Sequence, residues 1–236
     1  MKMFKKLLFA GLAFTSITVS AQTADDIVSK NIEAMGGAAK IATLTSVKKT
    51  GTMSAQGQDF PVTMTIDHMK GFRIDFEIMG TSNYQLITPT KSSTFMPIQQ
   101  MTEPKVSTEE ESKAQQGALD IHSGLYDYKV KGTTVELVGD DKVDGADVYK
   151  LKVTQKSGKS SFYLIDKKTN RVVKTISTGK GPDGVEMDIE TPYGDYKQNA
   201  DGYWFAYTTA MQGGAISVTY DKIESNIKID ENIFKD

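Results

Sequence analysis

The sequence predicts a mainly β protein, built as an antiparallel meander with a short N-terminal helix and one further helical segment. Two observations indicate this fold class. Apolar residues alternate with polar ones in many short runs, as in Phe72, Ile74, Phe76 and Ile78, and this period of two is typical of half-buried strands. Turns rich in Gly, Asp and Asn separate most of these runs, which favours hairpin connections.

The predicted strands follow one another along most of the chain. They cover residues 45–55, 60–66, 72–78, 84–88, 92–97, 133–138, 148–155, 160–166, 172–178, 185–192, 204–211 and 216–225. No Pro-, Gly- or Ser-rich linker divides them, so we expect one domain over residues 22–236.

Two segments depart from the strand pattern. Residues 23–40 place apolar side chains at helical spacing, with a capping box at Thr23 and Asp26 and a stop at Gly36 and Gly37. Residues 103–128 are polar, and the acidic run that follows Thr108 favours a helix capped by Ser107 or Thr108. We interpret this second segment as a mobile helical lid, or alternatively as a surface helix that seals one end of the sheet.

The first 21 residues resemble a cleavable signal peptide. Three lysines precede an apolar stretch that is too short to span a bilayer, and Val19 and Ala21 are the small residues that signal peptidase requires. We therefore expect cleavage after Ala21 and export of the rest of the chain. Loss of these lysines leaves 25 basic against 30 acidic residues, a net charge of −5.

Composition argues against several classes of function. The exported part is acidic and has no basic stripe, so nucleic acid is not an expected partner. The chain has no cysteine, and its two histidines, His68 and His122, are far apart in sequence with no zinc-type spacing. We predict no catalytic residue, no metal ligand and no cofactor, and we assign both histidines structural or surface roles.

Three stretches carry a resemblance to a known family. They are residues 71–76 (GFRIDF), 137–153 (LVGDDKVDGADVYKLKV) and 161–174 (SFYLIDKKTNRVVK). Together they resemble the outer-membrane lipoprotein-sorting proteins, the LolA-like and LolB-like carriers of the periplasm. The resemblance implies an incomplete antiparallel β-barrel wrapped around helices, with an apolar concave face for acyl chains. It also implies that Arg73 latches the lid by contacting residues 103–128.

A half-barrel exposes more inward-facing apolar side chains than two short helices cover, as a hydrophobic carrier requires. Methionine suits a surface that accepts variable chains, although it equally suits an irregular core. The predicted ligand-binding residues are Met64, Phe72, Ile74, Phe76, Ile78, Tyr84, Met96, Met101, Leu125 and Tyr126.

The function expected from these features is that of a monomeric periplasmic carrier or chaperone for a lipid, an acyl chain or an acylated lipoprotein. Envelope membrane proteins are the expected partners for loading and release. The first alternative is a non-enzymatic cell-envelope interaction module whose β core is filled by its own side chains. The second is a hydrolase acting on an envelope lipid or peptide, which would require a turnover that depends on His68 or His122.

Overall fold

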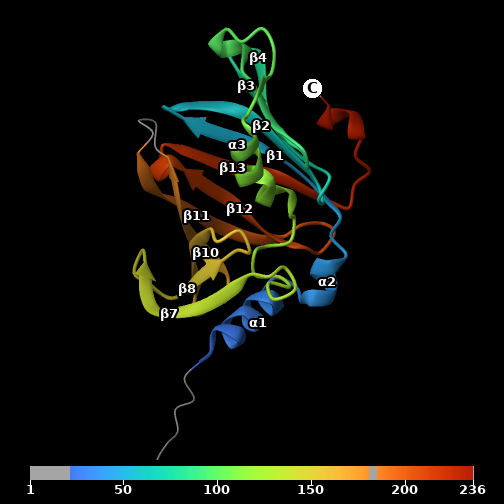
Figure 1. Cartoon of the computed structure of the whole chain (residues 1–236). Helices are drawn as coiled ribbons and strands as arrows, with labels where there is room; N and C mark the ends of the chain where they lie inside the picture. Colours follow the sequence, from blue (N-terminus) through green and yellow to red (C-terminus); the bar gives the residue numbers. More distant parts are fainter. Residues whose placement is uncertain (1–21, 181–184, 236) are drawn as a thin grey trace, which may run out of the picture.

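The thirteen strands described in the structure form one continuous, fully antiparallel sheet (Figure 1). The structure is a computed structural model that describes residues 22–180 and 185–235. The predicted signal peptide lies outside these residues. The sheet has two unpaired edges, β6 and β7, so it is an open half-barrel and not a closed barrel. The predicted fold class is thereby confirmed.

The strands run in the order β6-β5-β4-β3-β2-β1-β13-β12-β11-β10-β9-β8-β7. Almost every neighbour in this order is also a neighbour in sequence, and the first strand pairs with the last. The strands are β1 (Ser46–Ala55), β2 (Gln58–Asp67), β3 (Gly71–Ile78), β4 (Thr81–Ile87), β5 (Ser92–Phe95), β6 (Lys105–Val106), β7 (Thr134–Val143), β8 (Ala146–Thr154), β9 (Ser160–Asp166), β10 (Val172–Lys180), β11 (Glu186–Gln198), β12 (Trp204–Met211) and β13 (Ile216–Ser225).

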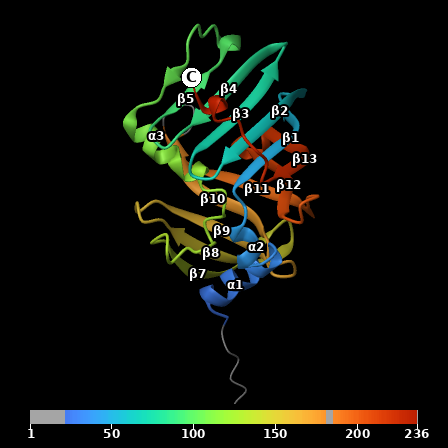
Figure 2. The same ribbon diagram turned by 90° about the vertical axis from the view of Figure 1, so that its right-hand side faces the viewer.

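The three α-helices are short and lie against the concave face of the sheet, whereas the 3₁₀ turn near the C-terminus (Glu231–Phe234) lies against the other face, beside Arg73. They are α1 (Ala24–Ala34), α2 (Ala38–Ala42) and α3 (Glu109–Gln115), with 3₁₀ turns η1 (Pro97–Gln99), η2 (Gln116–Leu119), η3 (Gln212–Gly214) and η4 (Glu231–Phe234). Figure 2 shows α1 and α2 at the end of the molecule that carries β7 to β9, whereas α3 lies nearer β4 and β5. Three short helices leave part of this concave face without a helical cover.

The helix signals in the sequence are confirmed, with one difference in extent. Thr23 and Asp26 form the predicted capping box, and Thr108 and Glu111 form a second one at α3. The predicted helix over residues 23–40 is two helices, because Gly36 and its neighbour Gly37 adopt positive φ between them. Only α3 and η2 are helical within the predicted lid.

Two strands extend far beyond their predicted C-terminal ends. β7 continues through the acidic run to Val143, and the hairpin turn falls on Asp144 and Gly145, both at positive φ. β11 continues past Pro192 to Gln198. Acidic residues and prolines lower strand propensity, but cross-strand pairing decides the outcome at both places.

Two apolar clusters hold the helices and the sheet together. One cluster lies on β1, β2 and β13, around Val47, Val62 and Val218. The other lies between α1 and strands β8 and β9, where Ile27 packs with Leu151 and Ile165. The concave face between these clusters is where a cavity remains.

Gly51 marks a kink in the sheet beside this cavity. The pairing of β1 with β13 shifts its register between Thr50 and Gly51. A Cβ added at Gly51 would lie 2.0 Å from the carbonyl oxygen of Thr219 and 2.6 Å from the Cα of Tyr220. Both are backbone atoms of the paired strand, so they cannot move without disturbing the ladder.

We therefore expect Gly51→Ala to lower the free energy of unfolding by at least about 2 kcal/mol, through overpacking against the backbone. Urea unfolding measures this change. The control is Gly117→Ala in η2, where an added Cβ meets nothing within 4 Å. That variant should unfold at the wild-type urea concentration or slightly above it. Equal urea midpoints for the two variants would contradict the assignment of Gly51 to a tight contact.

Candidate functional site

A cavity of about 350 Å³ lies on the concave face between the two apolar clusters. Its walls come from α1, α2, β1, β9, β10, β11 and β12, and from residues 121–124. Most of the lining is apolar or aromatic, including Ile32, Ile41, Val172 and Phe205. The volume is in the range of small-molecule pockets in proteins.

Lys49 is the one lysine among the residues that line this cavity. It projects from β1 on the same face as Met64, its cross-strand partner on β2. Its ammonium lies 5.1 Å from the ring centroid of Tyr220 and 5.4 Å from that of Phe205. Within the described part of the chain, no carboxylate or hydrogen-bond acceptor pairs with it.

Burial lowers the pKa of Lys49 from 10.5 to about 8, and burial is the only cause that acts on it. Removing an ammonium group from water without an opposite charge disfavours its charged form. At neutral pH, Lys49 therefore carries a positive charge that meets aromatic rings but no carboxylate among the residues that the structure describes. An anion in the cavity would compensate this charge.

The tyrosines of the cavity wall add neutral hydroxyl groups. Burial raises the pKa of Tyr163 to about 12, and it also raises the pKa of Tyr196. The hydroxyl of Tyr196 donates to the carbonyl of Val172 at 2.7 Å. The wall is thus polar at a few points and holds no negative charge of its own that would neutralise Lys49.

The end of α1 is fixed to the sheet beside the cavity. Arg171 donates to the carbonyl of Ala34 in the last turn of α1 at 3.2 Å, and its guanidinium stacks on Trp204 at 3.8 Å. The buried side chain of Asn31 donates to the carbonyl of Asn170 at 2.7 Å. A cation at a helix C-terminus and a satisfied buried amide both stabilise this arrangement.

Residues 121–124 form another wall of the cavity, and the segment that leads to them, residues 115–120, is attached to the sheet at several points. The side chain of Gln115 at the end of α3 accepts from Gln85 of β4 at 3.1 Å, and the carbonyl of Leu119 accepts from the amide of Met69 at 2.9 Å. The ring of His122 bonds the carbonyl of Leu44 at 3.0 Å. This segment is therefore both a cover over the cavity and a surface element bound to the sheet.

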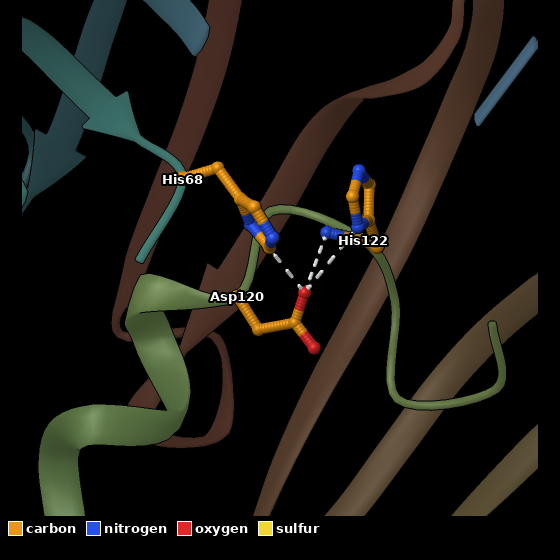
Figure 3. Close-up of side chains that lie close together, drawn as sticks. All are labelled: His68, Asp120 and His122. Carbon is orange, nitrogen blue, oxygen red and sulfur yellow. Dashed lines mark hydrogen bonds and ion pairs between the residues drawn. The ribbon is translucent and has the colours of Figure 1, made fainter. Parts of the chain in front are cut away.

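A cluster of three ionisable side chains lies where this segment meets the turn between β2 and β3 (Figure 3). Asp120 Oδ1 is 3.8 Å from Nδ1 of His68 and 3.8 Å from Nδ1 of His122. The two imidazole ring centroids are 4.3 Å apart. Desolvation, followed by the charge of His122, lowers the pKa of His68. The two histidines are therefore neighbours, contrary to their separation in the sequence.

The predicted ligand-binding residues do not line this cavity. Met64, Phe72, Ile74, Phe76 and Ile78 lie together on β2 and β3, half-buried, on the sheet face that also carries Lys49.

The other predicted ligand-binding residues are scattered. Leu125 is fully buried in the cluster under α1, and Tyr126 stacks beside His122. Met96 and Met101 flank η1 beyond β5. Tyr84 pairs with Asp75 and so lies on the sheet face opposite Ile74, because residues paired across antiparallel strands point to the same side.

Arg73 does not make the predicted contact with residues 103–128 in the described part of the chain. Its guanidinium donates to Asp75 at 2.8 Å and to the carbonyl of Ile233 at 3.0 Å, and it stacks on Tyr84 at 3.9 Å. These contacts bind β3 to the C-terminal turn η4. The reason is that Arg73 lies on the opposite sheet face from Ile74, away from the concave side.

Sequence reasoning missed both Lys49 and the cluster around Asp120. Lys49 follows another lysine in a strand with mixed polar and apolar residues, so its alternation gives no clear inward face. One signal was present: in β1, Val47, Lys49, Gly51 and Met53 share one face, and that face is otherwise apolar or small. No comparable signal marked the histidines, which meet only through the tertiary fold.

The pKa of Lys49 leads to a prediction for stability. Above pH 10.5, Lys49 is neutral in both the folded and the unfolded protein, so its burial does not lower the free energy of unfolding through its charge. As the pH falls from 10.5 to about 8, the unfolded chain takes up a proton that the folded chain does not, so stability falls. Below pH 8, Lys49 is protonated in both states, so the loss of stability no longer changes with pH. We expect Lys49→Met to stabilise the ligand-free protein by about 1–3 kcal/mol at pH 7.

Urea unfolding at pH 7 and pH 9.5 measures this effect, and the stabilisation should be smaller at the higher pH. The matched control is Lys48→Met, in the neighbouring position of β1 and on the other face of the sheet. A Lys49→Met variant that is no more stable than Lys48→Met at pH 7 would contradict an uncompensated charge at Lys49.

None of the helices in the described residues is both long enough and apolar enough to cross a membrane. No protein-family model matches the chain. No curated protein matches it either.

Solved structures do match. A LolA superfamily protein from Nitrosomonas europaea has a TM-score of 0.56 at 15% identity, covering 92% of this chain and 99% of that one. A putative outer membrane lipoprotein-sorting protein domain from Vibrio parahaemolyticus has a TM-score of 0.54 at 14% identity, covering 89% and 95%. A DUF1329 family protein from Desulfovibrio piger has a TM-score of 0.51 at 9% identity, covering 91% and 98%.

Sequence identities this low show a similar fold and nothing about function. The resemblance of residues 71–76, 137–153 and 161–174 to lipoprotein-sorting proteins is confirmed at that level. This chain has a LolA-like fold.

Proposed function

We propose that this chain is a periplasmic carrier for an anionic amphiphile, such as a fatty acid or an acyl chain attached to an anionic lipid. The apolar part of the guest occupies the cavity under α1, α2 and residues 121–124, and its anionic group pairs with Lys49. The proposed function is binding and transfer, without a catalysed reaction. LolA-like proteins and a lipoprotein-sorting domain share the fold, which supports a carrier.

The observation that carries this proposal is an uncompensated lysine in an apolar cavity. A soluble protein gains nothing from this arrangement when the cavity stays dry, because the charge is desolvated and unpaired. A bound carboxylate or phosphate gives the ammonium a partner with charge-assisted hydrogen bonds. Each methylene that the guest buries contributes about 0.8 kcal/mol.

The apolar face predicted from the sequence adjoins this site. Lys49 is paired with Met64, and Met64 is paired with Ile74, so the row from β1 to β3 leads away from the cavity. Phe72 and Phe76 flank Ile74 on the same face and are half-buried. In this proposal, longer or second acyl chains extend from Lys49 along this row, which gives the predicted residues on β2 and β3 a role in binding.

The location and the partners rest on the sequence. The signal peptide predicted over residues 1–21 supports export to the periplasm, where a lipid in transit needs protection from water. Transfer requires membrane proteins that load and unload the carrier. Leu137 and Val138 on the edge strand β7 are exposed apolar residues where such a protein could dock.

The alternative function is an interaction module with a filled core. The cavity of about 350 Å³ favours a carrier over this alternative. The two functions differ in one measurable property, because a module binds no acyl chain in its interior.

Filling the cavity tests the binding site. We expect Ala206→Trp, which places an indole in the cavity wall, to weaken binding of a fluorescent fatty-acid probe to the delipidated protein by at least about tenfold. The control is Ala146→Trp at an exposed position of β8, which should bind like the wild type. Failure of the wild type to bind the probe, together with lipid-free protein from a detergent-free preparation, would favour the interaction module.

Exchange of the head group tests the role of Lys49. We expect Lys49→Met to lose about tenfold or more in affinity for a saturated fatty acid and to bind the fatty alcohol of equal length as the wild type does. Calorimetric titration or probe displacement measures both, with Lys48→Met as control. Equal losses for acid and alcohol would mean that Lys49 shapes the cavity, and no loss for either would remove Lys49 from ligand recognition.

A further inference from the structure

The side chains of His68, Asp120 and His122 bring three possible metal ligands close together. Oδ1 of Asp120 lies 3.8 Å from Nδ1 of His68 and 3.8 Å from Nδ1 of His122, and the three side chains offer ligand atoms that all lie within 4.8 Å of one another. His68 comes from the β2–β3 turn, whereas Asp120 and His122 follow η2. The fold alone brings them together, as Figure 3 shows.

The outer hydrogen bonds of the two histidines define which ring nitrogen holds the proton. Nε2 of His122 faces the carbonyl of Leu44 at 3.0 Å, and a carbonyl only accepts, so Nε2 donates its proton there. Nδ1 of His68 accepts a long hydrogen bond of 3.3 Å from the amide of Ile121. In the neutral rings, both Nδ1 atoms are therefore unprotonated and carry lone pairs.

Both Nδ1 atoms lie 3.8 Å from the same carboxylate oxygen, and no side-chain proton lies between the three atoms. The donors they share are backbone amides: Ile121 donates to Nδ1 of His68 at 3.3 Å, and His122 donates to Oδ1 of Asp120 at 3.0 Å. Two unprotonated imidazole nitrogens and a carboxylate oxygen this close repel one another, and a cation among them would remove this repulsion. We propose that His68, Asp120 and His122 bind a divalent metal ion of the zinc class. Imidazole and carboxylate are ligands that Zn²⁺ accepts in three-residue sites with an open fourth position.

The two nitrogen–oxygen distances fit this ion after a small contraction. Ligands that lie 2.0–2.1 Å from a tetrahedral zinc ion are about 3.3 Å apart. Asp120 Oδ1 is 3.8 Å from each histidine nitrogen, so these two separations need to shorten by about 0.5 Å. The ligand atoms of the two histidines lie within 4.8 Å of each other, so the two rings need to approach by up to about 1.5 Å. His68 is attached to a turn, and its long hydrogen bond to Ile121 is the contact that the metal replaces.

The surroundings also fit a metal site. The bond from His122 to the carbonyl of Leu44 is the outer contact that orients metal-bound histidines in many proteins. Lys131 pairs with Oδ2 of Asp120 at 2.6 Å. Oδ1 accepts the backbone amide of His122 at 3.0 Å, and its second lone pair is the one that would bind the ion. The side chains of His68, Asp120 and His122 are 31%, 24% and 11% exposed, so water can reach the open position.

A bound ion would couple this cluster to the cavity. His122 lines the cavity, and residues 121–124 form part of its wall. The ion would join this wall to the β2–β3 turn by coordinate bonds in place of two weak contacts. Metal binding would then hold the cover closed over the guest.

The test uses the full chain, purified from an expression host without a histidine tag and treated with a chelator. His68 and His122 are the only histidines, and the chain has no cysteine, so imidazole-dependent binding can arise only here. We expect one equivalent of Zn²⁺ in calorimetric titration and one equivalent of Co²⁺ with the visible absorption of a tetrahedral ion. His68→Ala and His122→Ala should each weaken binding at least about tenfold.

The matched control is Glu231→Gln, which removes a nearby exposed carboxylate that pairs with Lys70 and is not a ligand. It should bind both metals as the wild type does. If a histidine variant fails to fold, a measurement on the unsubstituted protein still tests the proposal. In its NMR spectra, the ring signals of both histidines should shift with one equivalent of Zn²⁺. Absent shifts, or stoichiometric binding that survives in both folded histidine variants, would overturn the proposal.

Discussion

A thirteen-stranded open sheet has more apolar surface on its concave face than three short helices can cover. This lack of helical cover determines where the cavity lies and what closes it. A helix buries a single stripe of side chains, and α1 packs its stripe against β8 and β9. The concave side between the two apolar clusters is closed instead by a non-helical stretch, residues 120–124. A packed interior would need longer helices at this place. The cavity is the consequence of their absence.

The charge of Lys49 gives this cavity its chemistry. An apolar cavity without polar groups would accept any hydrocarbon, whereas a buried ammonium favours an anion and disfavours a cation or a neutral head group. The same ammonium destabilises the empty protein, because burial lowers its pKa to about 8. Stability and recognition therefore oppose each other at one residue, as they do at many binding sites. A guest that carries a negative charge removes this conflict.

The cover over the cavity depends on polar contacts and not on apolar packing. Leu119 is its main buried anchor, while the hydrogen bonds of Gln115, Ile121 and His122 attach the rest. Polar contacts of this kind open at a lower free energy than a packed core does, because water replaces them. This construction suits a cover that must admit a guest, and a metal ion at the histidine cluster would strengthen it without adding apolar contacts.

The sequence by itself determined the local structure. Alternation identified nearly every strand, the capping box at Thr23 identified the start of α1, and Ser107 or Thr108 was identified as the cap of α3. Gly36 with Gly37 identified a helix stop, which in the structure is the break between α1 and α2. These features are readable because each depends on residues within a few positions of one another. The apolar row on β2 and β3, with Ile74 at its centre, was identified for the same reason.

Only the tertiary structure decided what the concave side contains. Strand register placed Tyr84 on the opposite face from Ile74, and a shift of one residue in register would have put both on the same face. Which of the two faces is concave, and therefore that Arg73 points away from the cavity, also depended on how the sheet bends. Lys49 became a cavity residue through the pairing of the first strand with the last, and His68 met His122 through the docking of residues 116–124 on a distant turn. Such contacts join residues far apart in the chain, and no local pattern of side chains records them.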